Sequence, residues 1–175
     1  RGKVDEVIMR VMDAVLAFPP ILMALVVVTI LGSSLSNTMI AIGVDYIPRF
    51  ARVIRGSVLS EREKEYVEGG RMVGEANLSI LFRQILPNSL SPLIVQSTVF
   101  IAYAMLTEAA LSFLGLGIQP PNPSWGSMLN EAKLFIESDP YLAIIPGLAI
   151  SITVLGFNLF GDGLRDILDP RLAKR

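Results

Sequence analysis

The chain has 175 residues, of which 52% are hydrophobic and only 18% are charged, and its formal net charge is −1. Soluble domains usually carry about 25% charged residues, and a membrane-spanning helix needs about 20 consecutive apolar residues. The composition therefore indicates an all-α, polytopic membrane protein, with a buried soluble helical core as the less favoured alternative. The sequence contains neither cysteine nor histidine, which excludes disulfide, thiol and imidazole chemistry and argues against a metal site.

Two membrane spans are predicted in the first third of the chain, at about 11–31 and 37–55. Pro19 and Pro20 would kink the first span. In the second span Asp45 and Arg49 are four residues apart with the acid first, which suits an intrahelical ion pair. Ionisable groups inside a span usually face the helix bundle or a cavity. The two residues are therefore predicted to form a structural pair, with contact to a transported solute as the alternative.

A charged segment at about 57–87 is predicted to form two short amphipathic helices around a turn. Ser60 and Glu63 have the spacing of a capping box, which would begin the first helix. Gly74 can adopt the left-handed conformation that ends a helix, and Asn77 can cap the second helix. The second helix carries an apolar stripe, formed by Leu78, Leu81, Phe82 and Ile85. This stripe is predicted either to be covered by a partner or to pack on the membrane-proximal helices of the same chain.

Two further spans are predicted at about 89–114 and 141–160. Glu108 lies 21 residues beyond Pro87, or about 30 Å along a helix with a rise of 1.5 Å per residue. This distance places Glu108 towards the far interface of the membrane. It is interpreted either as a residue that lines the outer mouth of a transport pathway or as a group that hydrogen-bonds between helices or contacts interfacial water. Trp125 suits an anchor at the same interface.

The distribution of basic residues predicts the topology. With four spans, both ends of the chain and the segment 57–87 lie on one side. Three, seven and four of the 15 Lys and Arg residues fall within 1–10, 49–83 and 165–175, and only Lys133 lies elsewhere. The positive-inside rule makes the basic side cytoplasmic.

Several kinds of chemistry find no support in the sequence. It has no phosphate-binding loop of the Gly-x-x-x-x-Gly-Lys-Ser/Thr type, no Ser-His-Asp set and no basic pattern for nucleic acid. No cofactor is predicted. An enzyme embedded in the membrane is disfavoured, because the available intramembrane groups lie at different depths: Asp13, Asp45, Arg49 and Glu108. A transport subunit, a passive channel and an assembly scaffold remain.

The charged segment carries a known pattern of residues and spacings, formed by Glu68, Gly69, Gly70, Gly74, Gln84, Ile85, Leu86 and Pro87. It resembles the EAA loop of ABC importer permeases, which reads Glu-Ala-Ala, three residues, Gly, nine residues, Ile-x-Leu-Pro. Two features depart from that pattern. Both alanines are glycines here, which should loosen the first helix by about 1 kcal/mol each, and Gln84 replaces isoleucine.

Three further blocks resemble the C-type permease subunit of the dipeptide, oligopeptide and nickel importers, namely Phe18-Pro19-Pro20, residues 108–126 and residues 158–171. The resemblance implies one transmembrane permease domain over 1–175, in a bacterial or archaeal cytoplasmic membrane, as a fragment lacking about two upstream spans. It implies lipid contact and three protein partners: ABC ATPase subunits, a paired permease and an extracytoplasmic binding protein. The implied ATPase-coupling residues are Glu68, Gly69, Gly70, Gly74, Leu78, Leu81, Phe82, Leu86 and Pro87.

Overall fold

The computed structural model describes residues 2–168; residue 1 and residues 169–175, which include the end of the predicted domain and of its basic tail, lie outside the described residues. Within residues 2–168 every regular element is a helix, which confirms the all-α prediction for this part of the chain. The elements are α1 (Lys3–Leu16), α2 (Pro20–Leu31), α3 (Leu35–Glu61), α4 (Glu65–Met72), α5 (Asn77–Ser79), the π-helix η1 (Ile80–Ile85), α6 (Leu86–Phe113), α7 (Trp125–Ala132), the 3-10 helix η2 (Lys133–Phe135) and α8 (Tyr141–Leu168).

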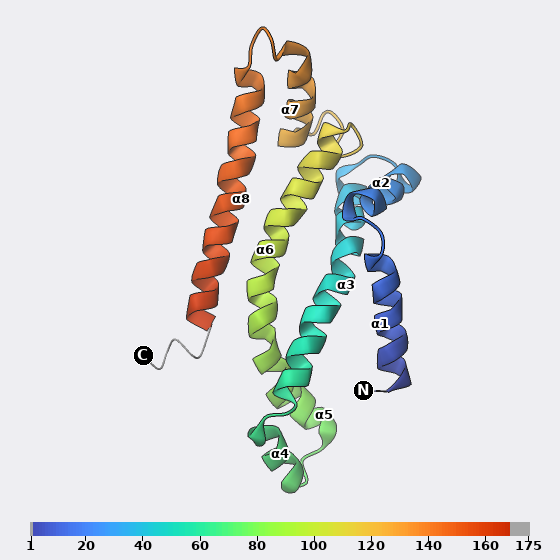
Figure 1. Ribbon diagram of the computed structural model, residues 1–175, viewed down its shortest axis with the longest axis vertical. Helices are drawn as coiled ribbons and strands as arrows, with labels where there is room; N and C mark the ends of the chain where they lie inside the picture. Colours follow the sequence, from blue (N-terminus) through green and yellow to red (C-terminus); the bar gives the residue numbers. More distant parts are fainter. Residues whose placement is uncertain (1, 169–175) are drawn as a thin grey trace.

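Three long helices form the body of the molecule, with α6 in the middle, α3 on one side and α8 on the other (Figure 1). Helix α1 runs beside α3, and α2 lies across the end of α3 that is near α7. The α4–α5 segment lies at the opposite end of the molecule from α7 (Figure 1). The bundle thus separates two ends, and each carries one of the sites described below.

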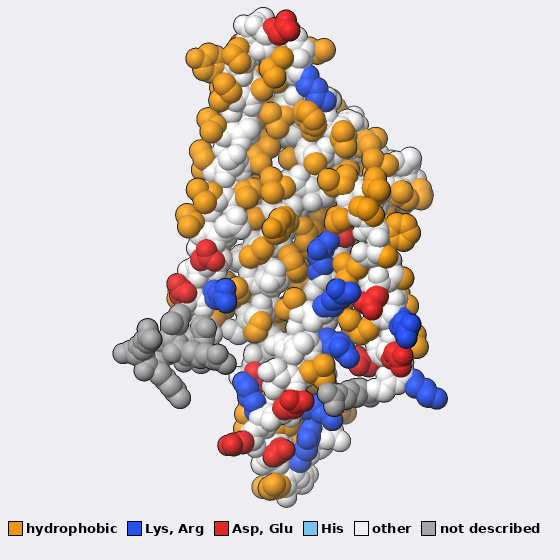
Figure 2. Space-filling model, in the orientation of Figure 1, with side chains coloured by type: hydrophobic (Ala, Val, Ile, Leu, Met, Phe, Trp, Pro, Cys, Tyr) orange, Lys and Arg blue, Asp and Glu red, His pale blue; other side chains and the backbone are white. Residues whose placement is uncertain are grey.

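The interior is small, and most large apolar side chains point outward. One buried cluster joins α2, α3 and α6, and consists of Ala24, Val28, Ala41, Ile42 and Leu111. Figure 2 shows hydrophobic side chains over most of the visible surface, whereas most Lys, Arg, Asp and Glu side chains gather towards the α4–α5 end. An apolar exterior bounded by a charged end suits a bundle whose solvent is lipid, because hydrocarbon removes the need to bury these side chains.

Glycine permits the closest helix contacts. A Cβ at Gly161 of α8 would lie 2.1 Å from the Thr98 hydroxyl oxygen of α6, and a Cβ at Gly126 of α7 would lie 2.3 Å from the Ala109 carbonyl oxygen of α6. Both distances are far below van der Waals contact. Small residues at helix crossings allow such close approach, as in other membrane bundles.

Within residues 2–168, two helices are long and apolar enough to cross a membrane, namely the continuous helix Asn77–Phe113 and helix α8. They cover the predicted spans at 89–114, except for its last residue, and at 141–160, although α8 continues to Leu168. The α1–α2 pair would count as a third if its bent helices cross together. Helix α3, which contains the predicted span 37–55, has 27 residues but does not meet the same criterion. The four-span arrangement stays a prediction.

The predicted kink at Pro19 and Pro20 is a complete break. Helix α1 ends at Leu16, Pro19 is extended with φ −59° and ψ 134°, and Pro20 begins α2. The two helices meet at 88°. Residues 11–31 therefore form two helices rather than one, because the extended Pro19 starts a new helix instead of bending an existing one.

Candidate functional site

The α4–α5 segment is a folded unit with its own small core. Val67 of α4 is fully buried against Ile80 and Ile85 of the π-helix. Val58, near the end of α3, and Leu81 pack around these three residues. The segment is therefore fastened to the ends of two long helices, α3 and α6, and a force applied to it would reach both.

The turn after α4 depends on Gly74. Its φ is +79°, a conformation that side chains with a Cβ rarely adopt. The amide of Gly74 donates to the Arg71 carbonyl at 3.1 Å, and the amide of Glu75 donates to the Gly70 carbonyl at 3.0 Å. These two bonds form a Schellman motif with Gly74 at the C′ position. The predicted helix stop at Gly74 is confirmed.

The predicted helix caps around the segment are wrong. Helix α3 continues to Glu61, so Ser60 lies in its last turn and cannot form a capping box with Glu63. Helix α4 begins only at Glu65, after the extended residue Lys64. Asn77 is the first residue of α5 and makes no side-chain cap. A short local pattern could not reveal that α3 continues past the predicted cap, since local propensity is a weak guide that the rest of the fold can override.

Glu61 closes the junction between α3 and α4. Its carboxylate accepts hydrogen bonds from Lys64 Nζ at 2.5 Å and from the Tyr66 hydroxyl at 2.7 Å. Partial burial would raise the pKa of Glu61, but these two hydrogen bonds outweigh burial and lower it. Burial, followed by the bond to Glu61, raises the pKa of Tyr66. Lys64 thus forms an ion pair with Glu61, three residues before it.

The predicted apolar stripe divides between two directions. Ile85 is buried and Leu81 packs on the segment's core, whereas Leu78 and Phe82 are 69% and 61% exposed. The cause is the π-helix, because its i→i+5 hydrogen bonds turn the chain differently from an α-helix. The π-helix is also not separated from the next long helix, since the chain continues through Leu86 and Pro87 into α6. The exposed apolar side chains of α4, of the residue after it, of α5 and of the π-helix make up the outward apolar face, namely Met72, Val73, Leu78 and Phe82.

A polar cluster fixes the turn from inside. Glu75 accepts hydrogen bonds from Gln84 Nε2 at 2.5 Å and from Ser79 Oγ at 2.6 Å. Gly70 makes room for this cluster, because a Cβ there would lie 3.2 Å from Glu75 Oε2 and 3.3 Å from Gln84 Nε2. Gly70 and Gln84 are both departures from the EAA pattern, and the structure brings them together. Gly69 faces open space.

Glu68 lies on the exposed side of α4, away from the segment's core. With Leu59, Arg62, Glu63 and Arg71 it lines a polar hollow of about 260 Å³. The predicted coupling residues therefore differ in their surroundings. Gly70 and Gly74 shape the turn, Leu81 packs on the core, and Leu86 and Pro87 begin α6. Gly69, Glu68 and the outward apolar face are exposed.

The three predicted intramembrane polar residues do not form one site. Asp45 is buried and accepts a hydrogen bond from Arg49 Nε at 3.1 Å, so the predicted pair forms. Arg49 also lies over the Tyr46 ring, with its guanidinium carbon 5.8 Å from the ring centre. Glu108 is separate: it faces an apolar pocket near α7 and accepts a hydrogen bond from Ser112 Oγ at 2.7 Å.

Comparison with known proteins settles the family of this helical chain. Residues 1–174 match the family described as the binding-protein-dependent transport system inner membrane component. The chain belongs to this family.

Curated relatives agree with this assignment. The chain is 50% identical over 171 residues to the glutathione transport system permease protein GsiD of Pectobacterium atrosepticum, covering 98% of this chain and 57% of that protein. It is 49% identical over 169 residues to the dipeptide transport system permease protein DppC of Alkalihalophilus pseudofirmus, covering 97% of this chain and 56% of that protein. The chain thus spans about half the length of the curated relatives it matches.

Helices α1 and α3 are joined by ion pairs that sequence analysis missed. Arg55 of α3 binds Asp5 of α1 through two hydrogen bonds of 2.8 and 2.9 Å, and Arg52 binds Asp13 at 2.7 Å. Helix α1 has no buried residue, so these pairs are a main part of its attachment to α3. The only sequence signal was the spacing of three residues between arginines on α3, which does not identify partners some 40 to 50 positions away.

Proposed function

We propose that the chain is the membrane-spanning permease subunit of an ATP-driven importer that moves peptides, glutathione or related small solutes across the cytoplasmic membrane. The observation that carries this proposal is the family match over residues 1–174. Two of the relatives are named for the transport of glutathione and of dipeptides. Nickel stays within the proposed range only through the sequence blocks that resemble nickel importers.

The proposed topology has four spans, with the α4–α5 segment in the cytoplasm. Its support is the distribution of Lys and Arg, because no basic residue except Lys133 falls on the other side of the predicted spans, and Arg49, Arg52 and Arg55 lie in the part of the second span nearest the segment. Helix α3 would cross as the second span despite its charges, since Arg49, Arg52 and Arg55 are each paired with an acid. Pairing lowers the cost of placing ionisable groups near lipid.

The α4–α5 segment, about 57–87, is proposed to be the coupling element that an ATPase subunit binds. Its outward apolar face exposes Met72 and Val73 by 85% and 83%, which is unfavourable in water and suits a protein partner. The polar hollow beside it adds charges of both signs, including Glu68. A partner bound there would push on α3 and α6 through the core around Val67.

Two other partners complete the proposed transporter. A paired permease would form the solute pathway with this chain, and a binding protein outside the cytoplasm would deliver the solute. Support comes from the family description, which names binding-protein-dependent transport. The ATPase subunits would supply the nucleotide site, since this sequence has no phosphate-binding loop.

The test is reconstitution of the complete transporter into liposomes, with the binding protein and radiolabelled glutathione or dipeptide outside and ATP inside. We expect uptake that stops when the ATPase is inactivated by substitution of its catalytic carboxylate. Uptake that persists without ATP hydrolysis would instead identify a passive channel. An intact complex that carries neither solute under any condition would refute the proposed substrate class.

A further inference from the structure

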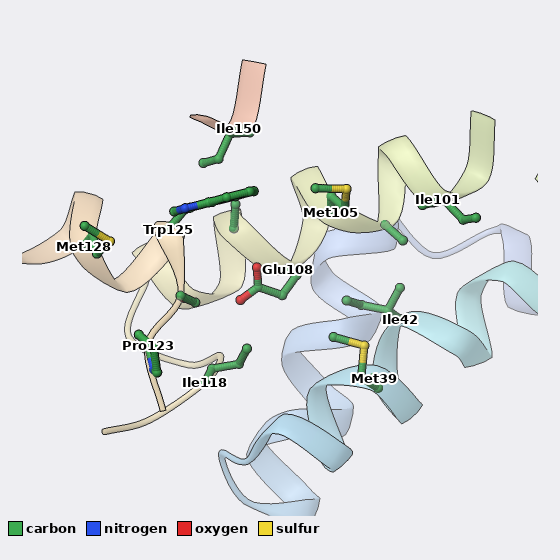
Figure 3. A pocket seen from close by; sticks show the side chains of 13 residues that line it. Met39, Ile42, Ile101, Met105, Glu108, Ile118, Pro123, Trp125, Met128 and Ile150 are labelled. Carbon is green, nitrogen blue, oxygen red and sulfur yellow. The ribbon is translucent and has the colours of Figure 1, made fainter. Parts of the chain in front are cut away.

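A pocket of about 540 Å³ opens between α3, α6, α7 and α8 at the end of the bundle opposite the α4–α5 segment. Its main side chains are Met39 and Ile42 of α3, Met105 and Glu108 of α6, and Trp125 and Met128 of α7. Figure 3 shows these side chains around the Glu108 carboxylate, which points between the Trp125 indole and the residues of α3. The volume is within the range of small-molecule sites, about 300–1,000 Å³.

Glu108 is the only charged residue that lines this pocket. Within the described residues no Lys or Arg forms an ion pair with it. The basic residue of this end, Lys133, bonds Asn130 and the Phe113 carbonyl, and its Nζ lies 3.7 Å from the centre of the Phe113 ring. Ser112 fixes the carboxylate, because its hydroxyl donates to Glu108 and accepts from the Ile118 amide at 3.0 Å. A held carboxylate among apolar groups favours a cation from outside the chain.

Trp125 narrows the class of cation. The indole face attracts ammonium groups through its quadrupole, most strongly when the cation is desolvated. Three methionines around it have flexible and polarisable side chains, which adapt to different apolar partners. The combination suits a primary ammonium group attached to a variable organic body, and it does not suit a bare divalent metal, for which one carboxylate is too few ligands.

We propose that the pocket between Glu108 and Trp125 binds the ammonium group of the transported solute. Dipeptides and glutathione, named for the relatives, both carry a primary ammonium group. This inference rests on the proposed function, in which the pocket lies at the extracytoplasmic end of α6. A solute released there by a binding protein would meet the pocket before crossing the bundle.

The test uses the cysteine-free sequence. Cysteine is placed in the pocket as Met105→Cys or, in a second variant, Met128→Cys, and the complete transporter is prepared in lipid nanodiscs. The rate at which the cysteine is modified is measured with two methanethiosulfonate reagents, one that carries a trimethylammonium group and one that carries a sulfonate group. Mass spectrometry of this chain follows the modification. The exposed residue Leu134, changed to cysteine, supplies the reference ratio of the two rates.

We expect the ratio of the cationic to the anionic modification rate in the pocket to exceed the ratio at Leu134→Cys. Glu108→Gln should lower the pocket ratio about tenfold, since the carboxylate attracts one reagent and repels the other at short range. Glutamine retains an oxygen that can accept the Ser112 hydrogen bond, so the fold should persist. Glu131→Gln, an exposed change on α7, should leave the ratio unchanged. Equal ratios with and without Glu108, or no modification at either pocket position, would overturn the inference.

A second arm identifies the ligand class. Alanyl-alanine should slow modification of Met105→Cys, whereas N-acetyl-alanyl-alanine, which lacks the ammonium group, should not. Equal protection by both, or by neither, would overturn the assignment to ammonium. Because modification needs no ATP, this result is independent of the uptake assay. If the pocket with Glu108 intact shows no preference for the cationic reagent while uptake is intact, only the pocket inference fails. If the pocket shows that preference but the transporter carries no solute, the proposed function fails.

Discussion

The ion pair inside α3 allows a quantitative prediction, because its two members are buried to different extents. The Asp45 side chain is 7% exposed and that of Arg49 is 35% exposed. Removing one member of a buried pair costs about 3–5 kcal/mol, since the other charge is left without compensation. The cost should depend on which charge remains.

Arg49→Gln leaves the carboxylate of Asp45 buried, and Arg49 supplies its only hydrogen bond within the described residues. We expect this change to lower the free energy of unfolding by about 3–5 kcal/mol. Asp45→Asn leaves an arginine that lies over the Tyr46 ring and is only partly enclosed by the protein. Its long side chain can extend towards the headgroup layer, so the loss should be about 1–2 kcal/mol. The double variant contains two neutral amides, and its loss should be well below the sum of the single losses.

The assay is equilibrium denaturation of the purified chain in detergent or bicelles for the wild type, both single variants and the double variant. A coupling energy of about 2 kcal/mol or more is expected from this cycle, because the residues are in direct contact. Strictly additive losses would show that the two charges do not interact in the folded protein. A larger loss for Asp45→Asn than for Arg49→Gln would refute the argument from burial.

Three further predictions concern a helix contact, the turn and the junction between α3 and α4. Gly161→Ala should destabilise the chain by about 1–3 kcal/mol, since a Cβ would lie 2.1 Å from a hydroxyl oxygen of α6. The measurement is thermal denaturation, and the control is Gly163→Ala, because a Cβ there meets nothing within 4 Å. Gly74→Ala should cost about 1–2 kcal/mol because of its positive φ, whereas Gly69→Ala should stabilise α4 by up to about 1 kcal/mol; the same sign for both in denaturation would contradict the turn geometry. The pKa of Glu61 is lowered from 4.5, so its charged carboxylate adds to the free energy of unfolding. This stabilisation is complete above pH 4.5 and is lost as the pH falls through the lowered pKa. The difference in stability between the wild type and Glu61→Gln should therefore shrink from pH 7 to pH 3.

Features set by residues close in sequence could be predicted from the sequence. The apolar runs identified α6 and α8, the spacing of four identified the pair of Asp45 with Arg49, and Gly74 identified the turn. Each of these depends on a helical period or on the conformational range of one residue. No knowledge of the partner helix was needed.

Features set by residues distant in sequence could not be predicted. The pair of Arg55 with Asp5 joins residues 50 positions apart, and no local period relates them. The π-helix changed the direction of Phe82 because a different hydrogen-bond pattern alters which side chains share a face. Gly70 and Gln84 each looked like an isolated departure from a family pattern, and only their proximity shows that one makes space for the other.

The central claim is that an ATPase subunit binds the outward apolar face of the α4–α5 segment, and a cross-linking experiment tests it most directly. Cysteine is introduced at Val73 or Phe82, both exposed on that face, and coupled to a short photoactivatable group in the assembled transporter. Leu134→Cys at the opposite end is the control. We predict that illumination joins Val73→Cys and Phe82→Cys to the ATPase subunit and leaves Leu134→Cys free of it. A transport-competent complex in which neither loop position cross-links to the ATPase would contradict the claim.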